Sequence, residues 1–446
     1  MKPRYCQTDH PATDRGQRPK LLASSATATS TSMRPKLLAS SATARTLTVL
    51  CLWTWGVLFP TPAIAQPVFE THELPTQLAV GYAVRVLDVN QDGHLDIAIV
   101  DAKRVLWLAG PDWTEHVIYE TPDAKFDNVS FAPHDIDGDG LVDFALGADW
   151  QPGNSDSGGT IGWLQHTPTG PWVYHPIASE PTTHRMNWIA LGDAGTPSLI
   201  VGPLKGRGTR PPGFDQSPVR LLAFDPPADP TQQNWNQRVL TDQLHVMHNF
   251  EASDLDGDGQ TEIIAASYEG VTWIHSNEQG EIELQPLGTG QQTPAPQRGA
   301  SEIRAGKLAS GKNYLATIEP WHGDKVVVYL PPEEWQQSAQ LWSRRVLDDQ
   351  LAWGHAVACA NLDDDADQEL IIGVRDNLDD HSRCGLRIYD PVDAAQGEWT
   401  RSLVDPGGVA SEDLAAADLD ADGDIDIVAV GRATHNVRIY WNQLVK

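Results

Sequence analysis

Short apolar runs separated by turn-forming residues recur from about residue 66 to the end of the chain. Seven of these runs are alike, each four residues long and rich in β-branched, leucine and aromatic side chains, as is typical of buried strands. They stand at 105–108, 161–164, 221–224, 271–274, 327–330, 386–389 and 437–440. Polar and apolar residues alternate in a further strand after several of them, as at 113–118 and 399–404. The pattern predicts an all-β protein.

An acidic nonapeptide precedes another apolar strand in five places and divides the chain into units. In the copy from Asp254 to Glu262, carboxylates at positions 1, 3, 5 and 9 accompany a glycine at position 6, which permits a tight turn. Because a strand rather than a helix follows, the motif is not an EF-hand. The five copies occupy 88–96, 135–143, 254–262, 361–369 and 418–426.

The spacing of the five copies predicts seven units. Their first residues are 47, 119, 107 and 57 positions apart, so two intervals are about twice as long as the others. Each long interval contains a strand pair that lacks the acidic loop, at 188–201 and at 303–318. Four strands in a unit of about 54 residues are typical of a propeller blade. We therefore expect a seven-bladed β-propeller over residues 66–446.

The seventh unit ends before a fourth strand of its own. Residues 68–74 (VFETHEL) resemble the fourth strand at 113–118 (WTEHVI), and they precede the first unit. A propeller has no open sheet edge when such an N-terminal strand completes the last blade. We predict that residues 68–74 close the ring in this way.

The acidic loops predict calcium sites. Clustered carboxylates on a tight turn are hard oxygen ligands, and a cation relieves their mutual repulsion. We expect up to five structural calcium ions, all on one face of the propeller. The predicted ligands are Asp88, Asn90, Asp92, Asp96, Asp135, Asp137, Asp139, Asp143, Asp254, Asp256, Asp258, Glu262, Asn361, Asp363, Asp365, Glu369, Asp418, Asp420, Asp422 and Asp426.

The balance of charge bears on partners and on the compartment. The chain has 60 acidic and 32 basic residues, a net charge of −28, and no basic patch that would neutralise phosphates. This argues against a nucleic-acid partner. Bound cations and export to a calcium-rich compartment would both relieve the repulsion among so many carboxylates.

Residues 1–65 differ from the rest and predict a secretory signal. An apolar run at 46–59 precedes small residues at positions 63 and 65, so we expect cleavage near Ala65. The run is short for a membrane span, which needs about 20 residues, so we expect a secreted or periplasmic protein without one. The sequence RPKLLASSATA occurs at 18–28 and again at 34–44, directly after Met33, which is therefore the expected start of translation.

Two cysteines follow the signal segment. Cys359 and Cys384 can pair after export, but both stand beside apolar strand residues. The sequence leaves their pairing open.

The repeats resemble two known groups of proteins. The pattern D-x-[DN]-x-D-G-x-x-[DE] before a strand is similar to the FG-GAP or VCBS repeats of calcium-bearing propellers, over nearly all of residues 66–446. Residues 248–259, 298–308, 318–329 and 353–363 resemble the propeller part of the aldos-2-ulose dehydratase group, which are sugar lyases. Members of that group carry cupin domains after the propeller. The resemblance implies a carbohydrate substrate and, without cupin domains here, no isomerase step assigned to them.

The face opposite the acidic loops holds the candidate catalytic residues. Counting back about six residues from each loop, or from its degenerate equivalent, reaches the start of the innermost strand at the mouth of the central channel. The connections between second and third strands reach the same face. The candidates from both sets are His184, Lys205, His248, Glu302, Arg304, His322, His355 and Glu412.

This set is compatible with more than one function. His248, His355 and either Glu302 or Glu412 could hold a divalent metal whose charge stabilises an enediolate, while a neutral histidine removes the proton beside a carbonyl and an acid releases water. Lys205 or Arg304 would be electrostatic partners in this elimination.

Three alternatives remain open. The same groups beside Trp150 and Trp321 could bind a sugar without turnover, or Glu302 and Glu412 could be a glycosidase pair. The third is a non-catalytic adhesion or protein-binding module. Phosphate-loop, Gly-x-Ser-x-Gly and His-Glu-x-x-His motifs are missing, which argues against enzymes of those types.

Overall fold

The computed structural model describes residues 67–444, except 122–124, 192–194, 278 and 376–383. The predicted signal segment and Met33 lie outside the described residues. The described part forms seven four-stranded antiparallel sheets and one short 3₁₀ segment, η2 (Trp335–Gln337). No helix among these residues has the length and apolar character needed to cross a membrane.

The sheets follow one another along the chain, and each is named here from its innermost strand outwards. Blade one contains β2 (Gly81–Leu87), β3 (Asp96–Asp101), β4 (Arg104–Ala109) and β5 (Thr114–Glu120). Blade two contains β6 (Ser130–His134), β7 (Asp143–Ala148), β8 (Thr160–Gln165) and β9 (Val173–Ser179). Blade three contains β10 (Thr183–Ile189), β11 (Ser198–Pro203), β12 (Leu221–Asp225) and β13 (Asn236–Thr241). Blade four contains β14 (Asn249–Ser253), β15 (Glu262–Ser267), β16 (Gly270–Ser276) and β17 (Ile282–Gly288).

The last three blades complete the order. Blade five contains β18 (Ile303–Lys307), β19 (Asn313–Glu319), β20 (Lys325–Leu330) and β21 (Ser343–Asp348). Blade six contains β22 (Gly354–Ala360), β23 (Glu369–Val374), β24 (Gly385–Asp393) and β25 (Glu398–Asp405). Blade seven contains β26 (Ser411–Ala417), β27 (Asp426–Gly431), β28 (Val437–Asn442) and β1 (Phe69–Glu73).

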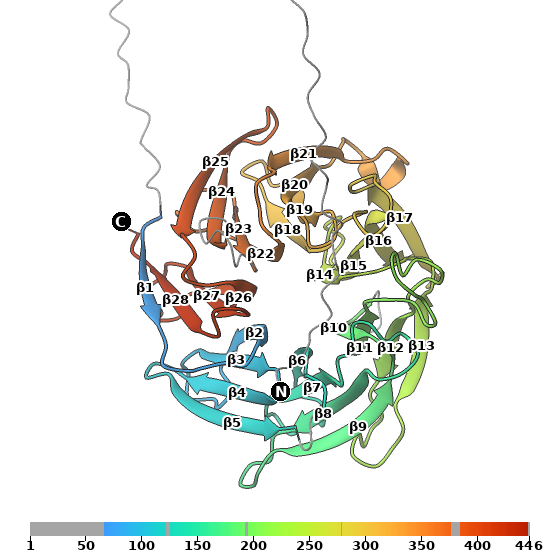
Figure 1. Ribbon diagram of the computed structural model, residues 1–446, viewed down its shortest axis with the longest axis vertical. Helices are drawn as coiled ribbons and strands as arrows, with labels where there is room; N and C mark the ends of the chain where they lie inside the picture. Colours follow the sequence, from blue (N-terminus) through green and yellow to red (C-terminus); the bar gives the residue numbers. More distant parts are fainter. Residues whose placement is uncertain (1–66, 122–124, 192–194, 278, 376–383, 445–446) are drawn as a thin grey trace, which may run out of the picture. The chain divides into compact units, whose positions relative to one another are not determined.

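The seven blades surround a common axis (Figure 1). The first strand of each blade contacts the first strand of the next all the way round, from β2 through β26 and back to β2. The core lies between neighbouring sheets, where the second strands are fully buried. For example, Ile97 and Ile99 of β3 pack with Val428 and Val430 of β27. The predicted seven-bladed propeller is confirmed, and the two units without an acidic loop form blades three and five.

The N-terminal strand closes the ring as predicted. β1 pairs antiparallel with β28, with Phe69 opposite Asn442 and Glu73 opposite Arg438. These two strands lie side by side in blue and red in Figure 1. The side chains of Glu73 and Arg438 also form an ion pair of 2.6 Å between Oε2 and Nη2. No disulfide joins the two described cysteines, Cys359 and Cys384.

Four of the innermost strands begin with an irregularity that matters for the site. The pairing of β2, β10, β22 and β26 with their second strands skips one residue near the start of the strand. The skipped residues are Tyr82, His184, His355 and Glu412. A bulge of this kind changes the direction of the side chain it carries. Three of the four are predicted site residues.

Candidate functional site

Histidines from three blades meet at the start of the innermost strands. His248 precedes β14, His355 stands near the start of β22, and His322 lies in the connection between β19 and β20. Ligand nitrogens of these three side chains all lie within 4.8 Å of one another. We call this group the histidine cluster. It lies at the opposite ends of the first strands from the acidic loops, as the repeat predicted.

The hydrogen bonds of the cluster fix which nitrogens face inwards. Nδ1 of His355 donates to the carbonyl oxygen of Glu412 at 2.5 Å, so its Nε2 carries the lone pair. Nδ1 of His248 lies 2.7 Å from Oε1 of Glu302, which again leaves Nε2 to face the cluster. Nε2 of His322 is 2.8 Å from Nε2 of His248. Neutral imidazoles arranged in this way are a ligand set for a divalent metal.

A buried carboxylate supports His248 from behind. Glu302 accepts a hydrogen bond from Asn249 Nδ2 and forms an ion pair with Arg185 Nη2 at 3.3 Å. Burial alone would raise the pKa of Glu302, but His248 and Arg185 hold it below its ordinary value. Glu302 is therefore a carboxylate that orients an imidazole, an arrangement that commonly supports a metal-bound histidine.

A second buried carboxylate borders the cluster on the side of blade seven. Oε1 of Glu412 lies 3.9 Å from Nε2 of His355 and 3.0 Å from Nη1 of Arg432. Its Oε2 lies 3.3 Å from Nε of Arg375. The predicted ligand set of His248 and His355 with either glutamate therefore differs from the observed arrangement. Each glutamate is engaged by arginine, and His322 supplies the third inward nitrogen.

The surroundings keep the cluster uncharged. Burial lowers the pKa of His322 and His355 well below the ordinary value, and Arg375 and neighbouring histidines lower it further. Burial also lowers the pKa of His248, although Glu302 opposes the effect. The imidazoles are therefore in the neutral form, which is the form that a divalent metal would require.

His184 and Lys205 lie next to the cluster without belonging to it. Nδ1 of His184 donates to the carbonyl oxygen of His248 at 3.0 Å, and burial lowers its pKa well below the ordinary value. Nζ of Lys205 donates to the carbonyl oxygen of Pro152 at 2.6 Å and lies 3.5 Å from the ring centre of Phe214. Burial lowers the pKa of Lys205 to about 8. His184 is therefore uncharged at neutral pH, whereas Lys205 can exchange a proton near it.

Tryptophans enclose the cluster. Trp321 stacks on His322 with ring centres 4.6 Å apart, and Trp150 lies 4.9 Å from His184. Trp353 lies 5.7 Å from His322 and is 47% exposed. An exposed indole beside polar groups is a common platform for a sugar ring.

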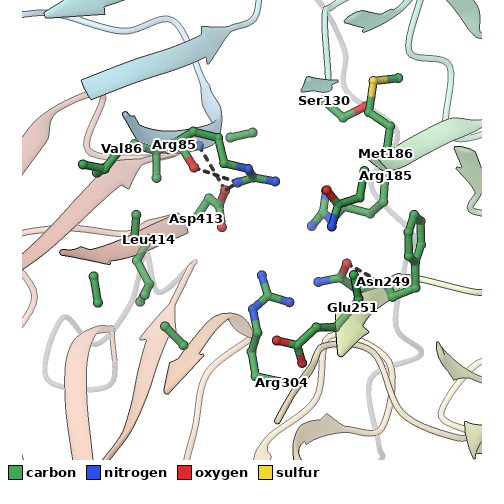
Figure 2. Close-up of a pocket in the computed structure, with 18 of the residues that line it drawn as sticks. Arg85, Val86, Ser130, Arg185, Met186, Asn249, Glu251, Arg304, Asp413 and Leu414 are labelled. Carbon is green, nitrogen blue, oxygen red and sulfur yellow. Dashed lines mark hydrogen bonds and ion pairs between the residues drawn. The ribbon is translucent and has the colours of Figure 1, made fainter. Parts of the chain in front are cut away.

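The central channel is a separate, polar space. It forms a cavity of about 400 Å³ lined by residues of all seven innermost strands. Arg85, Arg185 and Arg304 point into it, with Glu251 and Asp413 nearby (Figure 2). The predicted residue Arg304 therefore lines the channel rather than the histidine cluster. Arg185 contributes to both, because its Nη2 also binds Glu302.

The acidic loops share one local structure at the other ends of the first strands. Asp254 accepts hydrogen bonds from Gly257 N at 2.8 Å and Gly259 N at 3.0 Å. Gly259 has a φ of 87°, in the left-handed region that position 6 was expected to need. The first, third, fifth and ninth side chains come together, with oxygens of Asp254, Asp256, Asp258 and Glu262 within 4.8 Å of one another.

The ninth residue has a second role that the spacing did not reveal. In three loops both of its carboxylate oxygens accept backbone N–H groups and tie the loop to the blade. These residues are Asp96, Asp143 and Asp426. Burial raises the pKa of Asp143 to about 7 and that of Asp426 to about 6. In these loops the folded protein thus brings carboxylates together at partly buried positions, where ionisation of a carboxyl group is less favourable than in water.

The loop at 361–369 recruits carboxylates that were not predicted. Asp390 gathers with Asp363 and Glu369, and Asp367 gathers with Asp365 and Glu369. Burial raises the pKa of Asp367 to about 7 and that of Glu369 to about 9. Within the described residues, Oδ1 of Asp367 and Oε1 of Glu369 are buried without a hydrogen-bond partner. Such oxygens fit a cation.

Two arginines of the mouth were missed by the sequence reasoning. Arg185 directly follows the predicted His184, and Arg432 follows the second strand of its blade as Arg375 follows the second strand of blade six. That shared position was the available signal for Arg432. Arg207, in the connection between β11 and β12, takes part in a separate contact and pairs with Glu180.

A family model gives the comparison that bears on function. Residues 158–332 match the aldos-2-ulose dehydratase β-propeller domain. The chain is similar to that domain. The matched residues include His184, Lys205, His248, Glu302, Arg304 and His322, whereas His355 and Glu412 lie beyond them. The resemblance to FG-GAP or VCBS repeats stays a prediction.

A comparison with solved structures concerns the fold. A chain of the crystal structure of BBS1N in complex with ARL6DN, soaked with mercury, is 14% identical to this one with a TM-score of 0.49. The match covers 84% of this chain and 96% of that chain. No match is found among the curated proteins.

Proposed function

We propose that the protein is a carbon–oxygen lyase that dehydrates a keto-sugar at the channel mouth. The observation that carries this proposal is the histidine cluster, in which His248, His322 and His355 present neutral nitrogens within 4.8 Å of one another. The similarity to the propeller of a sugar dehydratase supports the substrate class.

The residues of the cluster fit a divalent metal. His248 and His355 each have Nδ1 occupied by an oxygen, so both direct an Nε2 lone pair inwards. In the metal-free protein one proton between the Nε2 atoms of His248 and His322 satisfies both nitrogens at 2.8 Å. A bound cation would take the place of that proton, and His322 would then carry its own proton on Nδ1.

The protein side chains supply the remaining parts of an elimination. When bound, a divalent cation supplies positive charge beside the substrate carbonyl, which lowers the cost of removing a proton from the adjacent carbon. His184 is the candidate base, because burial keeps it neutral and its Nε2 has only a long contact of 3.4 Å to Arg185 Nη1. Lys205 is the candidate acid for the departing hydroxyl group.

The atoms of this reaction balance without an oxidant. One C–H bond and one C–O bond break, a C=C bond forms between the two carbons, and the hydroxyl group leaves as water with a proton from the acid. The substrate must therefore carry a hydroxyl group on the carbon next to the one that loses its proton. Keto-sugars such as aldos-2-uloses have this arrangement.

The direct test follows ultraviolet absorbance of an unsaturated ketone during incubation with 1,5-anhydrofructose and with aldos-2-uloses. We expect a signal from the wild-type protein that requires a divalent metal and that His355→Ala abolishes. His435→Ala is the matched control, since His435 lies on the same face but binds Ala79 O outside the cluster. Absence of product with the metal-loaded wild-type protein, or equal rates in His355→Ala, would refute the lyase.

The role of His184 is tested separately from metal binding. We expect His184→Ala to retain the metal, measured by mass spectrometry of the purified protein, and to lose at least about 100-fold in rate. His355→Ala should lose both. If His184→Ala turns over normally, another group is the base.

We also propose that the acidic loops bind calcium and that the protein is exported. The support for calcium is the clustering of carboxylates with raised pKa values around Glu262 and Glu369. Calorimetric titration of the protein after chelation should show calcium binding. The support for export is the apolar segment before Ala65. N-terminal sequencing of the native protein should begin at Gln66, and an intact N-terminal segment would contradict cleavage.

A second candidate function is sugar binding without turnover. It is favoured by the exposed indole of Trp353 beside His322. In that case a keto-sugar would bind without a new absorbance, and Trp353→Ala would weaken binding while removal of the metal would not.

A further inference from the structure

The central channel differs in charge from the rest of the protein. The chain has a net charge of −28, yet three arginines and only two acids are among the residues that line this cavity of about 400 Å³. The arginines come from β2, β10 and β18, three separate blades, and their guanidinium groups point toward one another across the space (Figure 2). The volume is in the range of small-molecule sites.

The protein leaves much of the hydrogen-bonding capacity of these arginines unused. Arg304 donates to the carbonyl oxygen of Ile303 at 2.7 Å and forms no ion pair within 4 Å among the described residues. Arg85 reaches Asp413 only at 3.3 Å, and Arg185 reaches Glu302 at the same distance. Each guanidinium carries five N–H donors in a planar fork, so several donors on each side chain remain for a guest.

The two acids of the channel are held by the backbone. Asp413 accepts the backbone N–H of Val84 at 3.0 Å, and Glu251 accepts that of Ala305 at 2.6 Å. Glu302 pairs with Arg185 but is not a lining residue of the cavity. With three cations against these two carboxylates, the lining keeps a positive balance even when both acids are ionised.

We propose that the channel is a binding site for a small organic anion that carries a carboxylate or phosphate group. Guanidinium forks bind such oxyanions through paired, charge-assisted hydrogen bonds. Arg304 is the principal contact because, unlike Arg85 and Arg185, it forms no ion pair within 4 Å among the described residues, and Arg85 and Arg185 complete a ring of donors. The site is separate from the histidine cluster and does not depend on the proposed lyase activity.

The test is isothermal titration calorimetry at low salt with the full, calcium-supplemented protein. The probes are glucuronate, glucose 6-phosphate and neutral glucose, which share a ring and differ in the anionic group. We expect one or both anions to bind and glucose not to bind. The anion that binds identifies carboxylate or phosphate as the preferred group, whereas equal binding of all three probes, or of none, would overturn the proposal.

Three variants locate the site. Arg304→Gln should weaken anion binding at least about tenfold, and Arg401→Gln, on the outer strand β25, is the matched control that should leave it unchanged. Asp413→Asn removes a competing charge while keeping an acceptor for Val84 N, so it should tighten binding. This gain remains a test even if Arg304→Gln does not fold. The anion would bind elsewhere if Asp413→Asn and folded Arg304→Gln both bound the probe as tightly as the wild-type protein.

A last control separates this site from the lyase. His355→Ala should bind the anion as tightly as the wild-type protein, because His355 does not line the channel. Loss of anion binding in His355→Ala would contradict a separate site, whereas absence of dehydratase activity would leave the anion result standing.

Discussion

The two ends of the innermost strands are built on different principles. At one end, four of the acidic loops repeat a single local structure, in which the first carboxylate, such as that of Asp254, accepts backbone N–H groups three to five residues away. At the other end, the histidine cluster needs side chains from blades four, five and six. The acidic loops therefore follow the repeat, whereas the candidate site combines residues that differ from blade to blade.

This contrast predicts that the two ends respond differently to damage. Damage to the turn of one loop should stay local, because its first carboxylate accepts N–H groups of the same loop. The channel mouth should fail as a whole, because His248, Glu302 and Arg185 come from three separate blades. The predictions below test this difference, from the largest expected effect to the smallest.

Opening the ring should have the largest effect. Deletion of residues 66–75 removes β1 and exposes the edge of β28, so five paired positions of blade seven are lost. We expect the melting temperature to fall by roughly 10 °C or more and the activity of the mouth to disappear. Differential scanning calorimetry gives the first result. An unchanged melting temperature would refute closure by β1.

Removing two histidines should abolish activity but leave the stability and calcium binding of the propeller nearly unchanged. For His248→Ala together with His355→Ala, we expect a rate loss of at least about 1000-fold. The melting temperature and the number of calcium ions bound should change little, because the acidic loops lie at the other ends of the strands. Calorimetric titration with calcium measures the second point. A loss of calcium binding in this variant would break the distinction between the two ends.

Removing calcium from the acidic loops should instead lower the stability of the propeller. Chelation with EDTA leaves the carboxylates of the loops without a counter-charge, so we expect the melting temperature to fall by about 5 °C or more. Calcium should restore it. A divalent metal bound only by the histidine cluster should not. Equal melting curves with and without EDTA would count against calcium in the loops.

A single supporting carboxylate should have a graded effect. Glu302→Gln keeps the shape but loses the charge opposite His248, so we expect metal affinity at the cluster to fall by about 10- to 100-fold. Asp413→Asn is the control, because it removes a carboxylate from the channel but does not contact His248. Metal titration monitored by calorimetry distinguishes the two variants. Similar losses in both would indicate a general electrostatic effect.

The smallest expected effect concerns the pH dependence of stability. Burial raises the pKa of Glu251 to about 7, although Arg304 and the backbone N–H of Ala305 oppose the shift. The folded protein therefore keeps a proton that the unfolded chain releases near its ordinary pKa of about 4.3, and stability falls as the pH rises from there to about 7.

Glu251→Gln removes this contribution. The variant keeps an acceptor for Ala305 N, so relative to the wild type its melting temperature should be about 2 °C higher at pH 8 than at pH 5. Arg304 and Cys359 are the titratable neighbours that face Glu251, and both are unchanged in the variant. If the melting temperatures of the variant and the wild type differ by the same amount at pH 5 and pH 8, the pH dependence would not come from Glu251.

Much of the frame could be predicted because it depends on local sequence. The loop spacing alone located seven blades, and a six-residue offset from three loops reached His248, His355 and Glu412 at the opposite ends of the strands. This works because the residue six positions before each of these loops stands within one residue of the start of the innermost strand, and the bulges at His355 and Glu412 did not change it.

The pairing of side chains at the channel mouth could not be predicted because it depends on contacts between blades. Sequence reasoning chose Glu302 or Glu412 as a metal ligand, since carboxylates bind metals, but arginines engage both in the folded protein. It placed Arg304 beside the histidines, whereas the residue lines the channel. The curvature of the ring decides which side chains meet across the axis. A local sequence pattern does not contain this information.

The pairing of β1 with β28 has a consequence for the order in which the molecule is made. The strand that contains Phe69 is synthesised before blades one to six, yet its partner around Asn442 is synthesised after them. Until then the segment must remain unpaired while six complete blades form behind it. A chain whose synthesis stops short of β28 cannot close, so it retains an exposed strand and an open blade. The ring can therefore close only after β28 has been synthesised.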